Sequence, residues 1–379
     1  MRVVPGVIFA MRYPDDIGFV WNNIARLYDI VAGSIQPRTR CLVAYPKLTG
    51  TPAFVAEVLT PVQADFYDTS SANRPRLATI IEQRQIKTIV YMGCEPSTID
   101  LGWLRSQGVR TASYEQESFS PDATQPAWKR TMKRIVRGHL KQNIHDLYLA
   151  NAHHQRRFLL DFAGLPPTRV VTVVNGVDAD YFCPGDAPAP EALGLPRTDL
   201  YALSVCQARP EKRLEFLLDV AADVFARAPD LSLTFVHVGA GEVLDRCRAK
   251  AADFGLTDRF CFAGFHNDVR PFHRLSSFLV HAAERESFGL VIAESMACGK
   301  PAIATDSAGP SEIIVNGQTG RLVGKDDREA FAAAVIDLAT DAGRRDAWGT
   351  AARKRAWDRF SLRRQAEEFR LALTERGLC

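Results

Sequence analysis

The sequence predicts an α/β protein built from two doubly wound, parallel-sheet domains with a cleft between them. Short apolar runs with the length of buried strands alternate with longer segments of helical periodicity. This alternation occurs twice, and a run rich in Pro and Gly at 183–190 separates the two occurrences. A chain of 379 residues is long enough for two domains. We expect a first domain over 1–183 and a second over 184–359, with a C-terminal helix at about 360–379 that could pack back on the first.

In the first half, six apolar runs predict strands. They lie at 3–10, 41–46, 88–93, 110–114, 147–151 and 170–175. Between two of them, the segment 97–106 carries Ile99, Leu101 and Leu104 on one side of a predicted helix. The first run has no basic leader before it, so we expect a strand there rather than a signal peptide.

The second half repeats the pattern more clearly. The predicted strands are 201–206, 233–238, 260–262, 278–281, 302–305 and 321–323. The predicted helices are 212–227, 242–254, 288–298 and 328–339, and the chain beyond 340 is helical and polar. Strands separated by helices in this way predict βαβ units on a parallel sheet.

Composition and charge exclude several classes of protein. Hydrophobic residues make up 46% and charged residues 24%, which is typical of a folded globular chain and not of a disordered or collagenous one. The net charge of +3 is too even for a dedicated nucleic-acid binder. Residues 1–182 carry 21 Lys and Arg against 16 Asp and Glu, so an anionic partner is expected on that half. No apolar run reaches the 18 residues that would indicate a membrane-spanning helix.

The eight cysteines are scattered, and none forms a C-x-x-C pair. We therefore expect neither a zinc site nor a disulfide framework. A reduced, cytoplasmic setting fits this pattern, and peripheral contact with the inner face of a membrane is a further option.

One passage, 284–301, carries most of the chemical information. It predicts a strand, a loop that holds Glu286, and a helix from about Phe288 to Gly299. The first N–H groups of that helix, at Gly289 and Leu290, would form a phosphate site. Carboxylates at Glu286 and Glu294 could accept hydrogen bonds from sugar hydroxyls on either side of a diphosphate.

The spacing Glu286-x7-Glu294, with its flanking residues, resembles the E-x7-E motif of retaining glycosyltransferases of the GT-B fold, group 1 or family 4. The likeness continues in one frame through 304–314 and 316–323. Further segments are similar to the same family, namely 149–158, 174–182, 238–241 and 262–265. The resemblance covers about 145–360, whereas 1–140 match only in general pattern.

The resemblance implies two Rossmann-like domains that face a cleft, and it implies roles for particular residues. Glu286 would contact the hydroxyls of the donor sugar and Glu294 the ribose. Lys212 would bind the diphosphate, because charge develops there as the glycosidic bond breaks and these enzymes use no metal to neutralise it. The substrate-binding segment would also include Ser287, Phe288, Gly289, Leu290 and Gly239.

The sequence departs from the family pattern in two places. The family usually has an arginine five residues before the lysine, where this chain has Gln207; Arg209 could reach in instead. Many relatives also have a histidine after a strand of the first domain, and the corresponding stretch 112–118 has none. Glu115 or Glu117 could take a polar role there, and Gly18 could approach the diphosphate from the first loop.

Simpler interpretations remain open for several residues. Lys212 could be a solvated lysine at a helix start, and Gly239 could serve only a turn. His237 and His281 lie within apolar strands and are expected to be packed core histidines. Asp178 and Asp180 have the D-x-D spacing of metal-dependent transferases, but they fall in 174–182, which resembles the signature of the family's domain junction, so no metal is expected.

A basic stretch at 128–141 repeats apolar residues every four positions. A solvated helix packed on its own domain is the first interpretation. Contact with a membrane surface or with a lipid-linked, anionic acceptor is the second.

The predicted function is a retaining, metal-independent glycosyltransferase of hexosyltransferase type with no cofactor. It would move a sugar from a nucleoside-diphosphate sugar to a hydroxyl of a glycan, a glycolipid or a natural-product precursor, as in polysaccharide biosynthesis. The alternatives are a nucleotide-sugar epimerase or phosphorylase of the same fold, and a non-catalytic subunit that binds sugar nucleotides. No nucleic-acid partner is expected.

Overall fold

The computed structural model describes residues 5–15, 19–35, 40–50, 58–93, 99–116, 128 and 144–379. Contacts divide the chain into two compact units. The first comprises Met1–Asn175 and Leu362–Cys379, and the second comprises Gly176–Ser361. The division thus falls after Asn175, whereas the composition suggested a boundary after Cys183.

Two arginines hold the chain just before the Pro- and Gly-rich segment, and its first residue, within the second unit. Nη1 of Arg353 donates to the carbonyl oxygens of Ala179, Phe182 and Ala297, at 3.0, 3.1 and 2.6 Å. Nε of Arg274 donates to the carbonyl of Cys183 at 3.2 Å. Residues 179–183 are therefore docked by hydrogen bonds, and the Pro and Gly content of 183–190 did not reveal this.

The first unit is built on a seven-stranded sheet in the order β3-β2-β1-β4-β5-β6-β7. Every pairing is parallel. The strands are β1 (Gly6–Ala10), β2 (Arg40–Tyr45), β3 (Thr60–Gln63), β4 (Ile86–Met92), β5 (Arg110–Glu115), β6 (Leu147–Ala150) and β7 (Val170–Thr172). The helices are α1 (Phe19–Ile35), α2 (Arg74–Arg84), α3 (Leu101–Ser106), α5 (His153–Asp161), the 3-10 turn η3 (Pro167–Arg169) and α13 (Leu362–Glu375).

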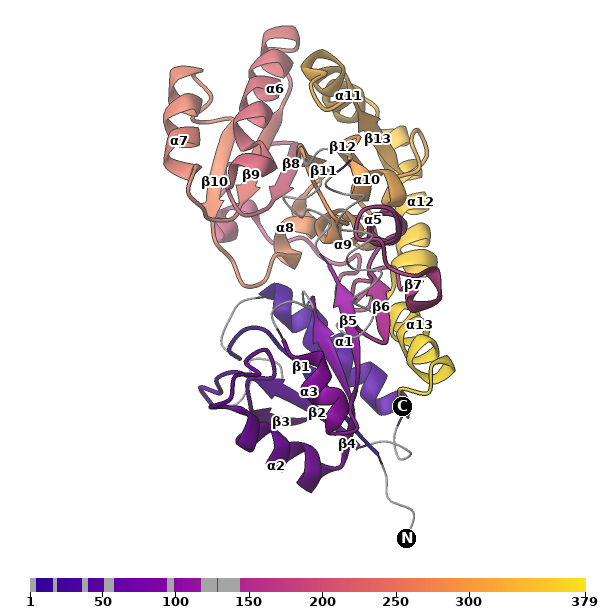
Figure 1. Ribbon diagram of the computed structural model, residues 1–379. Helices are drawn as coiled ribbons and strands as arrows, with labels where there is room; N and C mark the ends of the chain where they lie inside the picture. Colours follow the sequence, from indigo (N-terminus) through magenta and orange to yellow (C-terminus); the bar gives the residue numbers. More distant parts are fainter. Residues whose placement is uncertain are drawn as a thin grey trace. The chain divides into compact units, whose positions relative to one another are not determined.

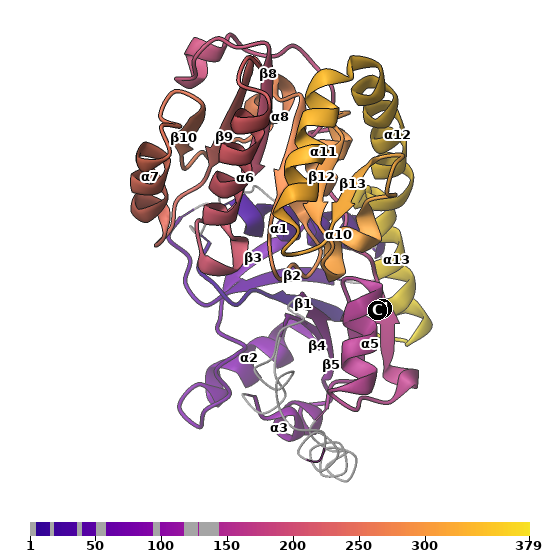
Figure 2. The same ribbon diagram turned by 90° about the horizontal axis from the view of Figure 1, so that it is seen from above.

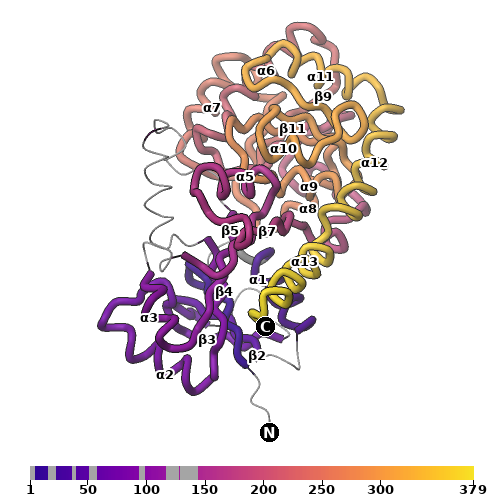
Figure 3. Tube along the Cα trace, turned by 45° about the vertical axis from the view of Figure 1, so that its right-hand side comes forward, coloured from indigo at the N-terminus to yellow at the C-terminus, as the bar shows by residue number. Residues whose placement is uncertain are grey.

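Helices cover both faces of this sheet, because its strands are apolar on both sides. Val7 and Phe9 of β1 pack with α1 and α13. The alternate residues Ile8 and Ala10 pack on the other face with α2 and α3. Helix α13 lies along α1 in this unit (Figure 3).

Helix α13 is fixed to the first unit by buried polar contacts as well as by its apolar face. Nε2 of Gln365 donates to the hydroxyl of Tyr114 at 2.5 Å and lies 3.3 Å from Oδ1 of Asn175. The ring of Phe369 packs edge-on against Tyr114. The C-terminal helix therefore completes the core of the first unit.

The second unit has a six-stranded parallel sheet in the order β10-β9-β8-β11-β12-β13. The strands are β8 (Leu200–Val205), β9 (Leu233–Val238), β10 (Phe260–Gly264), β11 (Phe278–His281), β12 (Ala302–Thr305) and β13 (Gly320–Val323). The 3-10 turns η4 (Pro190–Leu193) and η5 (Pro210–Lys212) precede α6 (Leu214–Arg227) and α7 (Leu244–Asp253). The remaining helices are α8 (Arg270–Leu275), α9 (Leu290–Ala297), α10 (Ala308–Ile313), α11 (Arg328–Thr340) and α12 (Ala342–Phe360).

This sheet is also buried on both faces. Helices α6, α7 and α11 pack on one face through a single apolar cluster, and Figure 2 shows α6 and α11 lying across the strands. Helices α8 and α9 contact the strands, and α10 and α12 contact α9. The doubly wound α/β class predicted from the sequence is confirmed. Strand β3 was not predicted.

Candidate functional site

The strand order places a topological switch point in the centre of the second unit. Strand β8 lies between β9 and β11, so the chain continues in opposite directions across the sheet from this point. In open α/β sheets, ligands bind at the carboxyl ends of the strands where the order reverses. Figure 1 shows β8 between β9 and β11. The loop after β8 leads to Lys212, and the loop after β11 carries Glu286.

The side chains of Lys212 and His281 meet at one carboxylate oxygen of Glu286. Nζ of Lys212 donates to Oε2 of Glu286 at 2.7 Å. Nε2 of His281, at the end of β11, lies 3.2 Å from the same Oε2. A carboxylate only accepts, so Nε2 is assigned as the protonated ring nitrogen. Oε1 of Glu286 accepts no hydrogen bond from the residues that the structure describes, so this oxygen is available to a ligand.

The surroundings keep Glu286 ionised. Burial by itself raises the pKa of this carboxyl. The hydrogen bond from His281 and the charge and hydrogen bond of Lys212 act in the opposite direction and are together stronger. The pKa of Glu286 therefore lies well below its ordinary value. At neutral pH this side chain is a hydrogen-bond acceptor and not an acid.

Backbone hydrogen bonds hold the loop that carries Glu286. The amide of Glu284 donates to the carbonyl of Glu211 at 2.9 Å, which ties the loop to the turn that ends at Lys212. The amide of Gly309 donates to the carbonyl of Glu286 at 3.0 Å. A Cβ at Gly309 would lie 2.4 Å from the carbonyl oxygen of Phe288, so only glycine fits there. The Lys212–Glu286 pair is thus set in a fixed frame.

Helix α9 begins directly after this pair. Gly289 caps it with φ of +97°, a conformation that favours glycine. The first N–H groups of an α-helix, here from Leu290 onward, have no carbonyl partner within the helix and attract anions. Ser287 is half-buried beside them, whereas the ring of Phe288 is buried against Phe360. Phe288 can therefore contribute to a ligand site only through its backbone.

Glu294 lies within α9 and is buried, at 9% exposure. Its Oε2 is 3.7 Å from Nε2 of His273, which is too long for a hydrogen bond. Both ring nitrogens of the fully buried His273 lack a hydrogen-bond partner within the described ranges. The carboxylate of Glu294 therefore lies beside an unsatisfied polar group, an arrangement that a bound hydroxyl could improve.

The glycine turn after β9 has a packing role. A Cβ at Gly239 would lie 1.9 Å from the carbonyl oxygen of Cys206, and one at Gly241 would lie 2.5 Å from that of Ala208. The amide of Ala208 donates to the carbonyl of Ala240 at 2.9 Å. The loops after β8 and β9 therefore pack backbone to backbone. A substrate contact for Gly239 stays a prediction.

Gln207 and Arg209 flank Ala208 in the loop after β8, and both are exposed. Arg209 makes no ion pair with any residue in the described part of the chain. Its side chain is therefore available to a ligand phosphate, and its role in place of the missing arginine stays a prediction.

The remaining predicted residues belong to the first unit. Glu115 ends β5 and accepts a hydrogen bond from Oγ of Ser113 at 2.6 Å. Gly18 lies outside the described residues, as does the stretch 129–141, whereas Trp128 is described and is 61% exposed. Among the helices that are described, none combines the length and the apolar character needed to span a bilayer.

Asp178, in the D-x-D spacing with Asp180, makes local backbone contacts. Oδ1 of Asp178 accepts the amide hydrogens of Asp180 and Tyr181, at 3.2 and 3.0 Å, so it caps a turn. Over the ranges that the structure covers, no group of three or more His, Cys, Asp or Glu side chains is placed to hold a metal ion.

His281 was expected to be a packed core histidine, and this interpretation is incomplete. It is buried, at 3% exposure, but its Nε2 faces Glu286. The available signal was its place as the last residue of a strand, five positions before the loop carboxylate. At the carboxyl end of a parallel strand, a side chain can reach the ligand edge of the sheet.

Comparison with known proteins gives the same interpretation of the second unit. The sequence model of a family described as glycosyl transferases group 1 matches residues 187–355. The D-inositol 3-phosphate glycosyltransferase of Acidothermus cellulolyticus is 33% identical over 200 residues, which are 50% of this chain and 45% of that protein. The protein of the same name from Rhodococcus jostii is 32% identical over 239 residues, 60% of this chain and 53% of that one. The chain spans about half the length of these curated relatives.

Solved structures show the shared fold. A glycosyltransferase from Rickettsia africae superposes with a TM-score of 0.78 at 18% identity, covering 98% of each chain. Anabaena Alr3699/HepE in complex with UDP and glucose superposes with a TM-score of 0.76 at 18% identity, covering 98% of this chain and 100% of that one. The fold is therefore the GT-B fold that the sequence predicted.

Proposed function

We propose that the chain is a retaining, metal-independent glycosyltransferase, because residues 187–355 match the sequence model of the glycosyl transferases group 1 family. It moves a hexose from a nucleoside-diphosphate sugar to a hydroxyl of a carbohydrate or lipid-linked acceptor. The observation that carries the proposal is the Lys212–Glu286 pair, held at the start of α9 and at the switch point of the sheet.

The donor diphosphate binds between Lys212 and the first N–H groups of α9. Lys212 supplies a full positive charge, and the helix supplies partial positive charge from its free amides. As the bond to the sugar breaks, negative charge accumulates on the diphosphate, and these groups stabilise it without a divalent ion. The exposed Arg209 adds a second cation from the same loop.

The sugar binds at the free oxygen of Glu286. Oε2 is engaged by Lys212 and His281, so Oε1 accepts hydrogen bonds from sugar hydroxyls. The low pKa of Glu286 keeps it ionised, and a charged acceptor forms stronger hydrogen bonds than a neutral one. The departing phosphate, and not this carboxylate, takes the acceptor proton, so attack occurs on the face that the diphosphate leaves and the anomeric configuration is retained.

Glu294 binds the ribose hydroxyls. The test compares UDP with 2′-deoxy-UDP on the wild type and on Glu294→Gln, with Glu284→Gln as control, since that carboxylate is exposed in the loop after β11. UDP is the first ligand to try because the Anabaena protein was solved with UDP and glucose. In the wild type, loss of the 2′-hydroxyl should weaken binding at least about tenfold. In Glu294→Gln the two ligands should bind alike.

A screen for the donor precedes this comparison. UDP-, GDP-, ADP- and dTDP-sugars are added to the wild type, and a rise in melting temperature identifies the nucleotide class. A donor that stabilises Glu294→Gln as much as the wild type would mean that the nucleotide binds elsewhere.

Product analysis separates the transferase from its alternatives. With donor and a carbohydrate acceptor, a transferase releases nucleoside diphosphate and forms a longer glycan, at the same rate with EDTA present. NMR of the new linkage should show the anomeric configuration of the donor. An isomerised sugar nucleotide without release would indicate an epimerase, phosphate-dependent cleavage a phosphorylase, and binding without turnover a non-catalytic subunit.

We also propose that the basic stretch 128–141 contacts a lipid-linked acceptor at a membrane surface. At low salt, vesicles containing anionic lipid should retain the protein, and neutral vesicles should not. Equal recovery of unbound protein with both kinds of vesicle would contradict this proposal and leave the transferase assignment untouched.

A further inference from the structure

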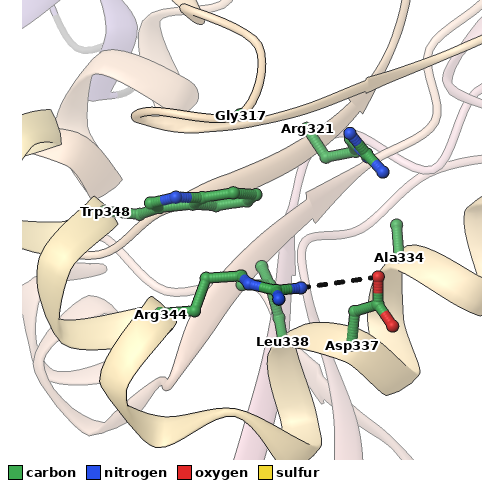
Figure 4. A pocket seen from close by; sticks show the side chains of 7 residues that line it. All are labelled: Gly317, Arg321, Ala334, Asp337, Leu338, Arg344 and Trp348. Atoms are coloured by element: carbon green, nitrogen blue, oxygen red, sulfur yellow. Dashed lines mark ion pairs between the residues drawn. The ribbon is translucent and has the colours of Figure 1, made fainter.

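The second unit contains a hollow of about 370 Å³ that none of the residues proposed to bind the donor lines. Figure 4 shows its walls. They come from the loop before β13, from β13 itself, and from α11 and α12, and the lining residues are Gly317, Arg321, Ala334, Asp337, Leu338, Arg344 and Trp348. Small-molecule pockets measure about 300 to 1,000 Å³, so the hollow has room for a small ligand.

The hollow lies at the amino ends of the strands, whereas the donor residues lie at the carboxyl ends. Gly317 precedes β13, whose first residue Gly320 pairs with Ala302, the first residue of β12. This is the amino end of both strands. Glu286 follows the carboxyl end of β11, and all these strands are parallel. A ligand in the hollow would therefore be separate from a donor at Glu286.

One wall of the hollow is the indole ring of Trp348, which is half-buried and packs against the apolar core of the unit. The guanidinium of Arg344 lies 5.9 Å from the centre of this ring. Figure 4 shows the guanidinium of Arg321 and the carboxylate of Asp337 around the same space. A rigid aromatic wall beside planar polar groups suits a ligand that has both an apolar face and hydroxyl groups.

The charges around the hollow are balanced. Arg344 is paired with Asp337 at 3.5 Å and with Asp341 at 3.2 Å. Arg321 is exposed and has no ion-pair partner in the described ranges. Two guanidinium groups and two carboxylates leave no net charge, so a strongly anionic ligand would gain little here. Both kinds of group, however, form strong hydrogen bonds with neutral hydroxyls.

We propose that this hollow binds a neutral pyranose, either a free glycoside or one unit of a glycan chain. The C–H face of the sugar lies on the indole of Trp348. Its hydroxyls donate to the carboxylate of Asp337 and accept from the guanidinium of Arg321. This binding site is independent of the proposed transfer reaction, because it shares no residue with the donor site.

The test follows each tryptophan separately. The chain has five tryptophans, so protein labelled with 5-fluorotryptophan gives five ¹⁹F resonances, and Trp348→Phe assigns one of them. Methyl α-D-glucopyranoside is the probe for a free glycoside, and maltotriose is the probe for a chain. We expect one or both to shift the Trp348 resonance saturably. A larger shift at lower concentration with maltotriose would identify a glycan chain as the ligand.

Pocket variants avoid reliance on Trp348, which also packs in the core. Arg321→Ala and Asp337→Ala should each weaken the apparent affinity at least about tenfold. Arg328→Ala is the matched control, because this exposed arginine lies on α11 with Asp337 but does not line the hollow. Arg328→Ala and Glu294→Gln should both bind the glycoside as the wild type does.

Three results would overturn the proposal: no shift of the Trp348 resonance with either probe, equal affinities in the pocket variants and the control, or a shift with glucose 6-phosphate but not with the neutral sugars. UDP binding is measured separately on the same samples, so a failure of the donor site would be distinguished from a failure of this one.

Discussion

Removing the amine that holds Glu286 tests the structure of the site directly. In Lys212→Met, the carboxylate loses a partner at 2.7 Å while its own side chain is only 12% exposed. Breaking a buried ion pair costs about 3 to 5 kcal/mol, and losing a hydrogen bond to a charged group costs about 1.5 to 3 kcal/mol. Because His281 still contacts Oε2 and Lys212 itself is 23% exposed, we expect the free energy of unfolding to fall by about 2 to 3 kcal/mol.

A double-mutant cycle isolates the pair. Lys212→Met and Glu286→Gln are combined, and urea unfolding is followed through the 5-fluorotryptophan resonances of Trp348 and Trp357, which both lie in the second unit. The coupling energy should be about 1.5 to 3 kcal/mol, because the single variants each remove the same contact.

The control is an exposed lysine–aspartate pair on α12. Nζ of Lys354 lies 2.5 Å from the carboxylate of Asp358, but the two side chains are 78% and 46% exposed. Solvent-exposed pairs couple by only about 0.2 to 1 kcal/mol. If the pair at the candidate site couples no more strongly than this surface pair, the reasoning that burial strengthens it is refuted.

The same pair gives a pH dependence with a defined sign. The pKa of Glu286 is lower in the folded chain than its ordinary value of 4.5. Its stabilising contribution is therefore complete above pH 4.5 and is lost as the pH falls below that value. The wild type should lose more stability than Glu286→Gln when urea midpoints at neutral pH are compared with those below pH 4.5. An equal loss of stability in the wild type and in Glu286→Gln would contradict the lowered pKa assigned to Glu286.

Three further substitutions test the frame around the site. Gly239→Ala, whose Cβ would lie 1.9 Å from the Cys206 carbonyl oxygen, should lower the free energy of unfolding by about 2 to 5 kcal/mol; Gly255→Ala, with open space, should lose only about 1 kcal/mol. Burial, with a smaller contribution from a nearby arginine, lowers the pKa of His237 to about 4, so the wild type should lose up to about 3 kcal/mol between pH 6.5 and 4. Urea midpoints should show that His237→Leu loses less stability than the wild type over that pH interval. Arg353→Leu, which leaves three carbonyls without their shared donor, should lower the melting temperature of the second unit, and an unchanged temperature would show that water replaces the arginine.

Periodicity predicted most of the sheet architecture because the strands are buried on both faces. Strand β9, for example, has all six residues buried and is a mainly apolar run that contains Thr234 and His237. Strand β3 was not predicted because it is an edge strand with mostly exposed residues, Thr60-Pro61-Val62-Gln63. An edge strand also tolerates proline. The contact-based division lies before the boundary suggested by composition for a different reason. Pro and Gly content reports local backbone preference, whereas Arg353 and Arg274 bind residues 179–183 from positions distant in the sequence.

Some features of the candidate site could likewise be predicted from the sequence, and others could not. Glu286, Glu294 and the start of α9 belong to one continuous passage, so their spacing was visible in the sequence. The contact between Lys212 and Glu286 joins residues 74 positions apart, and only the parallel pairing of β8 with β11 brings their loops together. His281 shows the limit of pattern reasoning most clearly. An apolar run that ends in histidine has the same appearance whether the ring packs in the core or faces a ligand edge, and the distinction depends on which neighbouring loop supplies an acceptor. Here the acceptor is the oxygen that Lys212 also binds, so His281 helps to fix the orientation of the Glu286 carboxylate.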